Sequence, residues 1–262
     1  MNNSTIRTVQ VTRYVTPLRE GGSLPAIVEA DDGFLYALKF RGAGQGSKAL
    51  IAELLGGEIA RVLGFRVPEI VFAQLDEAFG RTEPDEEIQD LLRASTGLNL
   101  ALHYLSGAIT FDPAVTRPDA ALASQIVWLD CLLTNVDRTA KNTNMLMWHN
   151  ELWLIDHGAS LYFHHTWDDW KVQAVKPFVR VKDHVLLAWA DELDMADKTL
   201  KSKLTEPVIE YIVQQIPNEW LANTGEQSPT EAREVYRQFL TMRVAASEVF
   251  VNEAKDARKR IV

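Results

Sequence analysis

The stretch that decides the fold runs from Asn135 to Asn144, Asn-Val-Asp-Arg-Thr-Ala-Lys-Asn-Thr-Asn, and leads through a short hairpin into Asp156-His157-Gly158. Strand-like segments at 145–148 and 152–155 enclose a turn, so acids and amides stand at both ends of one hairpin. Because a hairpin brings its ends together, we expect Asp137, Asn142 and Asp156 to converge. Carboxylate and amide oxygens suit Mg²⁺, which is completed by water and substrate phosphates. With Asn142 and Asp156 on the metal, Asp137 is left to orient or deprotonate a hydroxyl, the layout that phosphoryl transfer needs.

The first third of the chain alternates strand-like segments with turns. We expect strands at 5–14, 24–30 and 34–40, with Asp31-Asp32-Gly33 as the hairpin turn between the last two. A helix is predicted over 48–63, where apolar residues recur at helical spacing and Gly64 is placed to end it. Further strands at 67–75 and 98–105 enclose an exposed helix at 83–93. The pattern predicts a sheet with one helix against it.

The rest of the chain has a mostly helical pattern. A strongly apolar helix is predicted over Ala120–Leu133, and the later helices are expected at 182–191, 198–203, 206–215 and 230–258. The sequence therefore predicts an α+β protein in which the sheet comes first and the helices follow.

The loop and hairpin also resemble a known family. Asp137-x4-Asn142, followed by a hairpin and Asp156-His157-Gly158, is similar to the catalytic loop and metal-binding motif of the protein-kinase-like fold, and most closely to HipA-like kinases. The opening Asn135-x-Asp-Arg resembles the loops of HipA-like and phosphoinositide-kinase-like enzymes. Upstream, Tyr36-Ala37-Leu38-Lys39 is similar to the Val-Ala-Ile-Lys pattern of the third strand. These motifs cover roughly residues 20 to 160.

This resemblance implies a two-lobe architecture, with an N-terminal nucleotide-binding lobe of antiparallel sheet plus helix at 1–104 and a mostly helical catalytic lobe at 105–262. ATP and Mg²⁺ are then expected in the cleft. It implies that Asp137 is catalytic and that Asn142 and Asp156 bind the metal and the cofactor. The other implied nucleotide contacts are Lys39 on the phosphates, Glu53 as its ion-pair partner, Gly22 and Ser23 in the loop over the phosphates, and His103 and Leu105 in the hinge that reads adenine.

Two assignments stay open at this stage. Glu53 corresponds to the ion-pairing Glu by its distance from Gly64, but helical geometry places Glu58 on the apolar stripe, where a buried carboxylate needs a cation. Asn144 competes with Asn142 as metal ligand because the apolar pair Met145-Leu146 follows it directly.

Several family features are absent. No His-Arg-Asp precedes the loop, His157 replaces the usual Phe, and Thr139 stands where kinases often have a basic residue. We expect Lys141 to supply that charge near the transferred phosphate. The resemblance implies a Ser/Thr hydroxyl on a protein as acceptor. The alternatives are a small-molecule or lipid kinase, and a catalytically weak nucleotide-binding pseudokinase that acts through protein contacts.

The connection Gly42-x-Gly44-x-Gly46-Ser47-Lys48 leads from a strand into a helix. It matches neither Gly-x4-Gly-Lys-Ser/Thr nor Gly-x-Gly-x2-Gly. We interpret it mainly as a connection, with a minority interpretation in which its amides, at a helix N-terminus, contact phosphate.

Composition limits the other classes. With 27 Lys and Arg against 36 Asp and Glu, the net charge is −9, which argues against broad nucleic-acid binding. The basic cluster at 255–260 is interpreted as a solvated helix end. The longest apolar run, 185–190, is far shorter than the roughly 20 residues of a membrane span. The start lacks the pattern of a secretory signal and the single Cys131 cannot form an internal disulfide, so we expect a cytoplasmic protein. The family resemblance implies a protein substrate.

Overall fold

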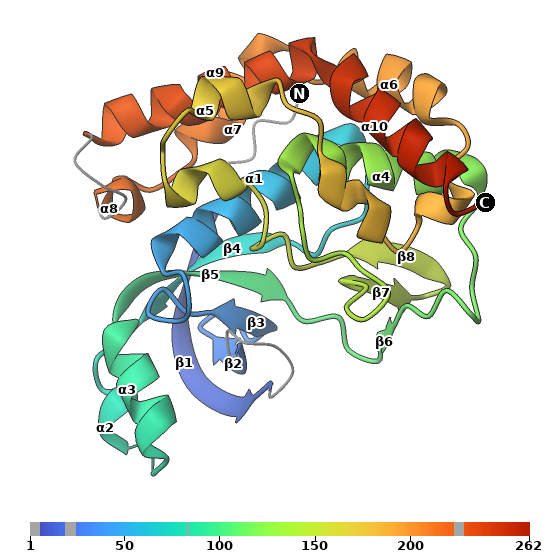
Figure 1. Cartoon of the computed structure of the whole chain (residues 1–262). Helices are drawn as coiled ribbons and strands as arrows, with labels where there is room; N and C mark the ends of the chain where they lie inside the picture. Colours follow the sequence, from blue (N-terminus) through green and yellow to red (C-terminus); the bar gives the residue numbers. More distant parts are fainter. Residues whose placement is uncertain (1–5, 19–24, 83, 223–227) are drawn as a thin grey trace.

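The computed structural model describes residues 6–18, 25–82, 84–222 and 228–262. A barrel of strands lies at one end of the molecule and a group of helices at the other, with helix α1 between them (Figure 1). The predicted order, sheet first and helices after, is confirmed. The elements of the first part are β1 (Thr8–Pro17), β2 (Ala26–Ala30), β3 (Leu35–Lys39), α1 (Ser47–Leu63), β4 (Ile70–Leu75), α2 (Phe79–Thr82), α3 (Glu86–Ala94) and β5 (Gly97–His103).

The five strands close into a barrel in the order β1-β2-β3-β5-β4. Every neighbouring pair is antiparallel except β1 with β4, which run parallel, so the expected antiparallel sheet closes through one parallel pair. Side chains alternate along β3: Tyr36 and Leu38 are fully buried in the barrel core. Because successive strand residues face opposite sides, Lys39 projects from the outer face of the barrel.

Helix α1 is buried along most of its length. Its apolar residues belong to the core of the helical part rather than to that of the barrel. Gly64, with a φ of 101°, ends the helix in the left-handed conformation, as the sequence predicts. The helix therefore packs in the core of the helical part and also presents side chains to the outer face of the barrel.

The second part contains three short strands and a set of helices. A three-stranded sheet in the order β6-β7-β8 holds the predicted hairpin. The elements are β6 (Ile109–Thr110), α4 (Ala120–Leu133), β7 (Met145–Trp148), β8 (Glu151–Leu154), η1 (Tyr162–His165), α5 (Trp170–Ala174), η2 (Val179–Asp183), η3 (Leu187–Trp189), α6 (Leu193–Lys201), α7 (Glu206–Gln214), α8 (Asn218–Leu221), α9 (Pro229–Ala245) and α10 (Ser247–Lys259).

Two helix predictions in this part are wrong. The helix expected at 182–191 is replaced by the 3-10 turns η2 and η3, because His184 between them is held in extended conformation by an isolated bridge to Thr139. The single helix expected at 230–258 is broken at Ala246 into α9 and α10. No Gly or Pro lies at that break, so the helical spacing of apolar residues continues across it and predicts a single helix.

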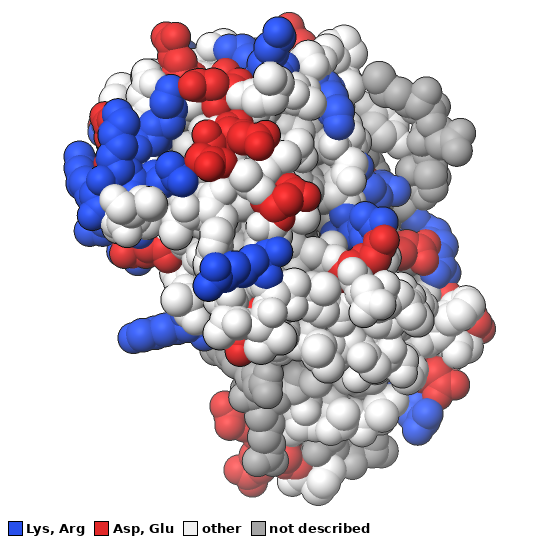
Figure 2. Space-filling view, turned by 90° about the vertical axis from the view of Figure 1, so that its right-hand side faces the viewer, with Lys and Arg blue, Asp and Glu red and all other residues white. Residues whose placement is uncertain are grey.

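Among the residues that the structure describes, no helix is long and apolar enough to cross a membrane. On the face seen in Figure 2, basic and acidic side chains alternate at the top instead of forming one continuous basic surface. At the end of α10, Arg258 and Lys259 lie within ion-pair distance of Asp191 and Asp256.

Candidate active site

Lys39 and two carboxylates meet between the barrel and the hairpin. Lys39 Nζ lies 2.7 Å from Glu53 Oε2 on α1 and 2.6 Å from Asp156 Oδ1, which follows β8. The Glu53 side chain is fully buried, whereas the Asp156 side chain is 45% exposed. The rival Glu58 pairs with Arg61 on its own helix. The fold thus joins residues from the barrel, the helix and the hairpin in one cluster.

The pKa values of this cluster favour its charged form. Burial alone would lower the pKa of Lys39, but the negative charges of Glu53 and Asp156 outweigh it and raise that pKa above its ordinary value. Burial alone would raise the pKa of Glu53, but the Lys39 ammonium lowers it to about 2. Lys39 and Glu53 are therefore an ion pair at neutral pH.

The loop before the hairpin presents Asp137 between two amides. Asp137 Oδ2 accepts hydrogen bonds from Asn142 Nδ2 at 2.7 Å and from Asn144 Nδ2 at 3.1 Å. Because both amides donate through nitrogen, their side-chain oxygens take no part in these bonds. Asn142 is exposed and Asn144 is buried directly before β7.

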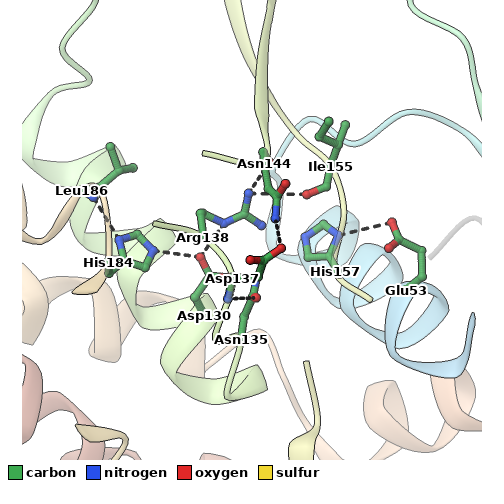
Figure 3. Close-up of polar contacts among 10 residues, drawn as sticks. All are labelled: Glu53, Asp130, Asn135, Asp137, Arg138, Asn144, Ile155, His157, His184 and Leu186. Carbon is green, nitrogen blue, oxygen red and sulfur yellow. Dashed lines mark hydrogen bonds and ion pairs between the residues drawn. The ribbon is translucent and has the colours of Figure 1, made fainter. Parts of the chain in front are cut away.

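A buried ionic network holds this loop (Figure 3). Asp130, near the end of α4, is fully buried and accepts from Asn135 Nδ2 at 2.9 Å and Arg138 Nε at 2.6 Å. His184 Nε2 lies 2.9 Å from Asp130 Oδ2, and its Nδ1 accepts from the Leu186 backbone N–H at 3.0 Å, which leaves the ring proton on Nε2 facing Asp130. Although burial would raise the pKa of Asp130, the Arg138 charge holds it well below its usual range.

The same network reaches the base of the hairpin. Arg138 donates to the carbonyl of Asn144 and, at 3.5 Å, to that of Ile155. The Ile155 backbone N–H donates to the Asn144 carbonyl at 3.1 Å, so Asn144 stands across the hairpin base from the residue before Asp156. Asn144 and Asp156 both have left-handed backbones, with φ of 49° and 55°. Such conformations are sparsely populated and gather at functional sites.

His157 fills the space between Asp156 and α1. Its side chain is fully buried, and its Nδ1 lies 3.9 Å from Glu53 Oε1, too far for a hydrogen bond. Gly56 on α1 makes room for it, because a Cβ on Gly56 would lie 2.5 Å from the His157 Cβ. The residue that departs from the kinase pattern is thus accommodated by a glycine one turn after Glu53.

The remaining predicted residues are Lys141, the two hinge residues and the two residues of the loop over the phosphates. Lys141 is exposed, and no ion pair joins it to another described residue. His103 ends β5 and its backbone N–H donates to the Glu69 carbonyl, whereas the Leu105 N–H makes no backbone hydrogen bond within the described ranges. Gly22 and Ser23 lie outside the described residues.

Sequence reasoning missed the members of the buried network. It treated Arg138 only as part of a motif and did not single out Asp130 or His184. One signal was present: an acid at position 130, inside a strongly apolar helix, needs a buried cation. His184 carries no such signal, because it is 54 positions away in sequence. Among the residues described, no group of three or more His, Cys, Asp or Glu could hold a metal ion.

Comparisons with known proteins address the family and the fold of this chain. The model of the HipA-like kinase family matches residues 11–253. The crystal structure of the Helicobacter pylori proinflammatory kinase CtkA is 14% identical over 99% of this chain and 100% of that chain, with a TM-score of 0.53, which shows the same fold. Two structures of the Golgi casein kinase, one with Mn/ADP bound, are each 10% identical, with TM-scores of 0.48; they cover 94% and 96% of this chain and 74% and 72% of theirs. The sequence has no significant match to a curated protein.

Proposed function

Because the chain belongs to the HipA-like kinase family, we propose that it transfers the γ-phosphoryl group of ATP to a Ser or Thr hydroxyl of a protein, with Mg²⁺ as cofactor. The observation that carries this proposal is the contact of Lys39 with both Glu53 and Asp156. A cation held between a helix and a hairpin is poised to neutralise the phosphates of a bound nucleotide. We also propose the lobe boundary near residue 104, directly after β5 ends at His103.

The donor atoms fit a hard cation. Asp156 has a half-exposed carboxylate. Asn142 and Asn144 donate to Asp137 through nitrogen, so their amide oxygens remain available to a metal. Oxygen ligands of this kind, completed by substrate phosphates, are what Mg²⁺ takes. Asp156 with Asn144, or with Asn142, would hold the metal. When bound, Mg²⁺ supplies neutralisation of the phosphate charge.

Asp137 is proposed to act on the acceptor. Its carboxylate is fixed by two amide donors, so one orientation is maintained before the acceptor arrives. As the acceptor oxygen forms its bond to the γ-phosphorus, the bond from that phosphorus to the ADP oxygen breaks, and Asp137 takes the hydroxyl proton. The exposed Lys141, four positions after Asp137, is proposed to face the charge on the transferred group.

Labelled ATP tests the proposal. The full chain is incubated with γ-labelled ATP and Mg²⁺, alone and with cell extract, beside the variants Asp137→Asn and Asp156→Asn. Asp90→Asn, at an exposed Asp on α3 away from the site, is the matched control. We expect labelled protein from the parent chain and the control, and a loss of about 10²- to 10⁴-fold with Asp137→Asn.

Other outcomes assign the alternatives. Label in an extractable small molecule would identify a small-molecule or lipid kinase. Nucleotide binding without any transfer would identify a pseudokinase. Transfer at full rate in both active-site variants would refute the roles given to Asp137 and Asp156.

A further inference from the structure

A cavity of about 450 Å³ opens at the start of α1, away from the proposed catalytic residues. It is lined by Arg41, Gln45, Gly46, Ser47, Lys48 and Ala94. Three of these residues belong to the connection between β3 and α1, two begin α1, and Ala94 ends α3. Lys39, Glu53, Asp137 and Asp156 do not line it, so the cavity is separate from the cluster described above.

The helix start leaves donors available. Gly46 precedes the first turn of α1 and gives no side-chain cap, and that turn contains no acidic residue. The Ala49 N–H bonds to the Gly46 carbonyl, but within the described ranges the N–H groups of Ser47 and Lys48 have no backbone acceptor. Unpaired N–H groups and the helix dipole together favour an anion at this end.

Ser47 is the independent observation that points to a ligand. It lines the cavity with only 8% of its surface exposed. No hydrogen bond joins its hydroxyl to any other described residue, so the hydroxyl is free to bind what enters the cavity that Ser47 lines. A ligand with acceptor oxygens in the cavity would satisfy it.

Lys48 supplies a positive charge that is not balanced by a carboxylate. Its Nζ contacts the His165 carbonyl at 3.4 Å and lies 5.9 Å from the Trp167 ring, and no Asp or Glu of the described chain is within ion-pair distance. Partial burial lowers the pKa of Lys48. Arg41 is already held by Glu219 at 3.2 Å and by the Thr96 carbonyl, so it adds charge to the wall without being free to move.

We propose that this cavity, which we call the α1 anion pocket, binds a phosphate-type dianion through the Ser47 hydroxyl, the Lys48 ammonium and the first N–H groups of α1. The ligand is free phosphate or the phosphoryl group of a phosphorylated side chain. Glu53 lies six positions after Ser47 on the same helix, about 9 Å along the helix axis at 1.5 Å per residue. Occupancy of the pocket would therefore stabilise the helix that positions the partner of Lys39. The pocket itself does not depend on the proposed phosphoryl transfer.

Calorimetric titration of the full chain with inorganic phosphate tests the pocket. We expect saturable binding that weakens at least about tenfold in Lys48→Met and in Ser47→Ala, because each removes a charge-assisted or buried donor. Lys198→Met is the matched control, since Lys198 is an exposed lysine on α6. Circular dichroism of every variant checks that the fold is retained. No saturable binding, or equal binding by Lys48→Met and the parent chain, would overturn the proposal.

Two further arms identify the ligand and the site. Tighter binding of N-acetyl-phosphoserine amide than of phosphate supports a phosphorylated side chain, and equal binding supports free phosphate. Phosphate binding should persist in saturating ADP and Mg²⁺ if the pocket is separate. Complete displacement by ADP would overturn the separate site and place these residues in the nucleotide site.

Discussion

The two sides of the candidate active site are built differently. On the hairpin side, Asp130 has partners for both carboxylate oxygens in Asn135, Arg138 and His184. On the α1 side, Glu53 Oε1 and both ring nitrogens of His157 are buried without a hydrogen-bond partner in the described chain. Within the described network of Asp130, Asn135, Arg138 and His184, the one such atom is Arg138 Nη2.

The hairpin-side network of Asp130, Asn135, Arg138 and His184 is therefore an anchor. The α1 side, with Lys39, Glu53 and His157, is the adjustable part. A buried network with nearly all its groups paired has little freedom, because any movement leaves a charge unpaired. The α1 side depends on Lys39, whose two carboxylate partners come from different elements, one of them half exposed. We infer that binding of the proposed nucleotide would rearrange the contacts of Lys39 and Glu53 while the loop carrying Asp137 stays in place.

The largest expected effect comes from breaking the anchor. Asp130→Ala leaves the Arg138 guanidinium buried without its carboxylate, and we expect a loss of about 3–5 kcal/mol in the free energy of unfolding. Urea unfolding followed by circular dichroism measures it. The control is Glu77→Ala, which removes the exposed pair with Arg81 and should leave the midpoint unchanged. If the two variants unfold alike, the hairpin side is not an anchor.

The next effect concerns the two amides on Asp137. Asn144 lies at the hairpin base beside the residue before Asp156, so Asn144→Gly should weaken Mg²⁺ binding in the presence of ADP on the order of tenfold to a hundredfold. Glycine is chosen because it tolerates the left-handed backbone of position 144. The matched variant Asn142→Gly, on the exposed loop, should have a smaller effect. Titration calorimetry measures both, and a larger effect from Asn142→Gly would assign the metal to that amide.

Much of the site geometry could be predicted because it depends on short sequence spacing. A hairpin must bring its two ends together, so the backbone pairing of Asn144 with Ile155, the residue before Asp156, followed from local pattern. The contact between Lys39 and Asp156 spans 117 positions and was expected only through the family resemblance. Helical periodicity alone could not choose between Glu53 and Glu58, because α1 is buried on nearly all sides and both acids are buried.

The contribution of His184 to the anchor lay beyond sequence reasoning. His184 approaches Asp130 because residues 179–189 form 3-10 turns joined by an extended residue, and the apolar spacing there resembled a helix. The role of Gly56 was hidden for a similar reason. A glycine inside a helix gives no indication of which distant side chain needs its space, and here that side chain is His157.

Gly56 and Gly57 allow a matched test of the adjustable side. In Gly56→Ala the new Cβ would meet the Cβ and Cγ of His157 at 2.5 and 2.9 Å, atoms that cannot move without the backbone. In Gly57→Ala it would meet Ile70 Cδ1 at 2.4 Å, the end of a flexible side chain. Helix propensity favours both changes equally. We therefore expect Gly56→Ala to be less stable than Gly57→Ala by at least about 1 kcal/mol in urea unfolding, and to raise the KM for ATP. Equal stabilities would mean that His157 is loosely packed.

The smallest effect is a dependence on pH at the Lys39–Glu53 pair. The pKa of Glu53 is lowered from an ordinary value of 4.5 to about 2, so its contribution to stability is complete above pH 4.5 and is lost as the pH falls toward 2. The difference in unfolding free energy between the parent chain and Glu53→Gln should be constant from pH 5 to 7 and shrink below 4.5. Lys39 adds no change in that window, because its raised pKa makes its contribution fall only in alkali. A difference that stays constant down to pH 3 would show that Lys39 does not hold Glu53 ionised.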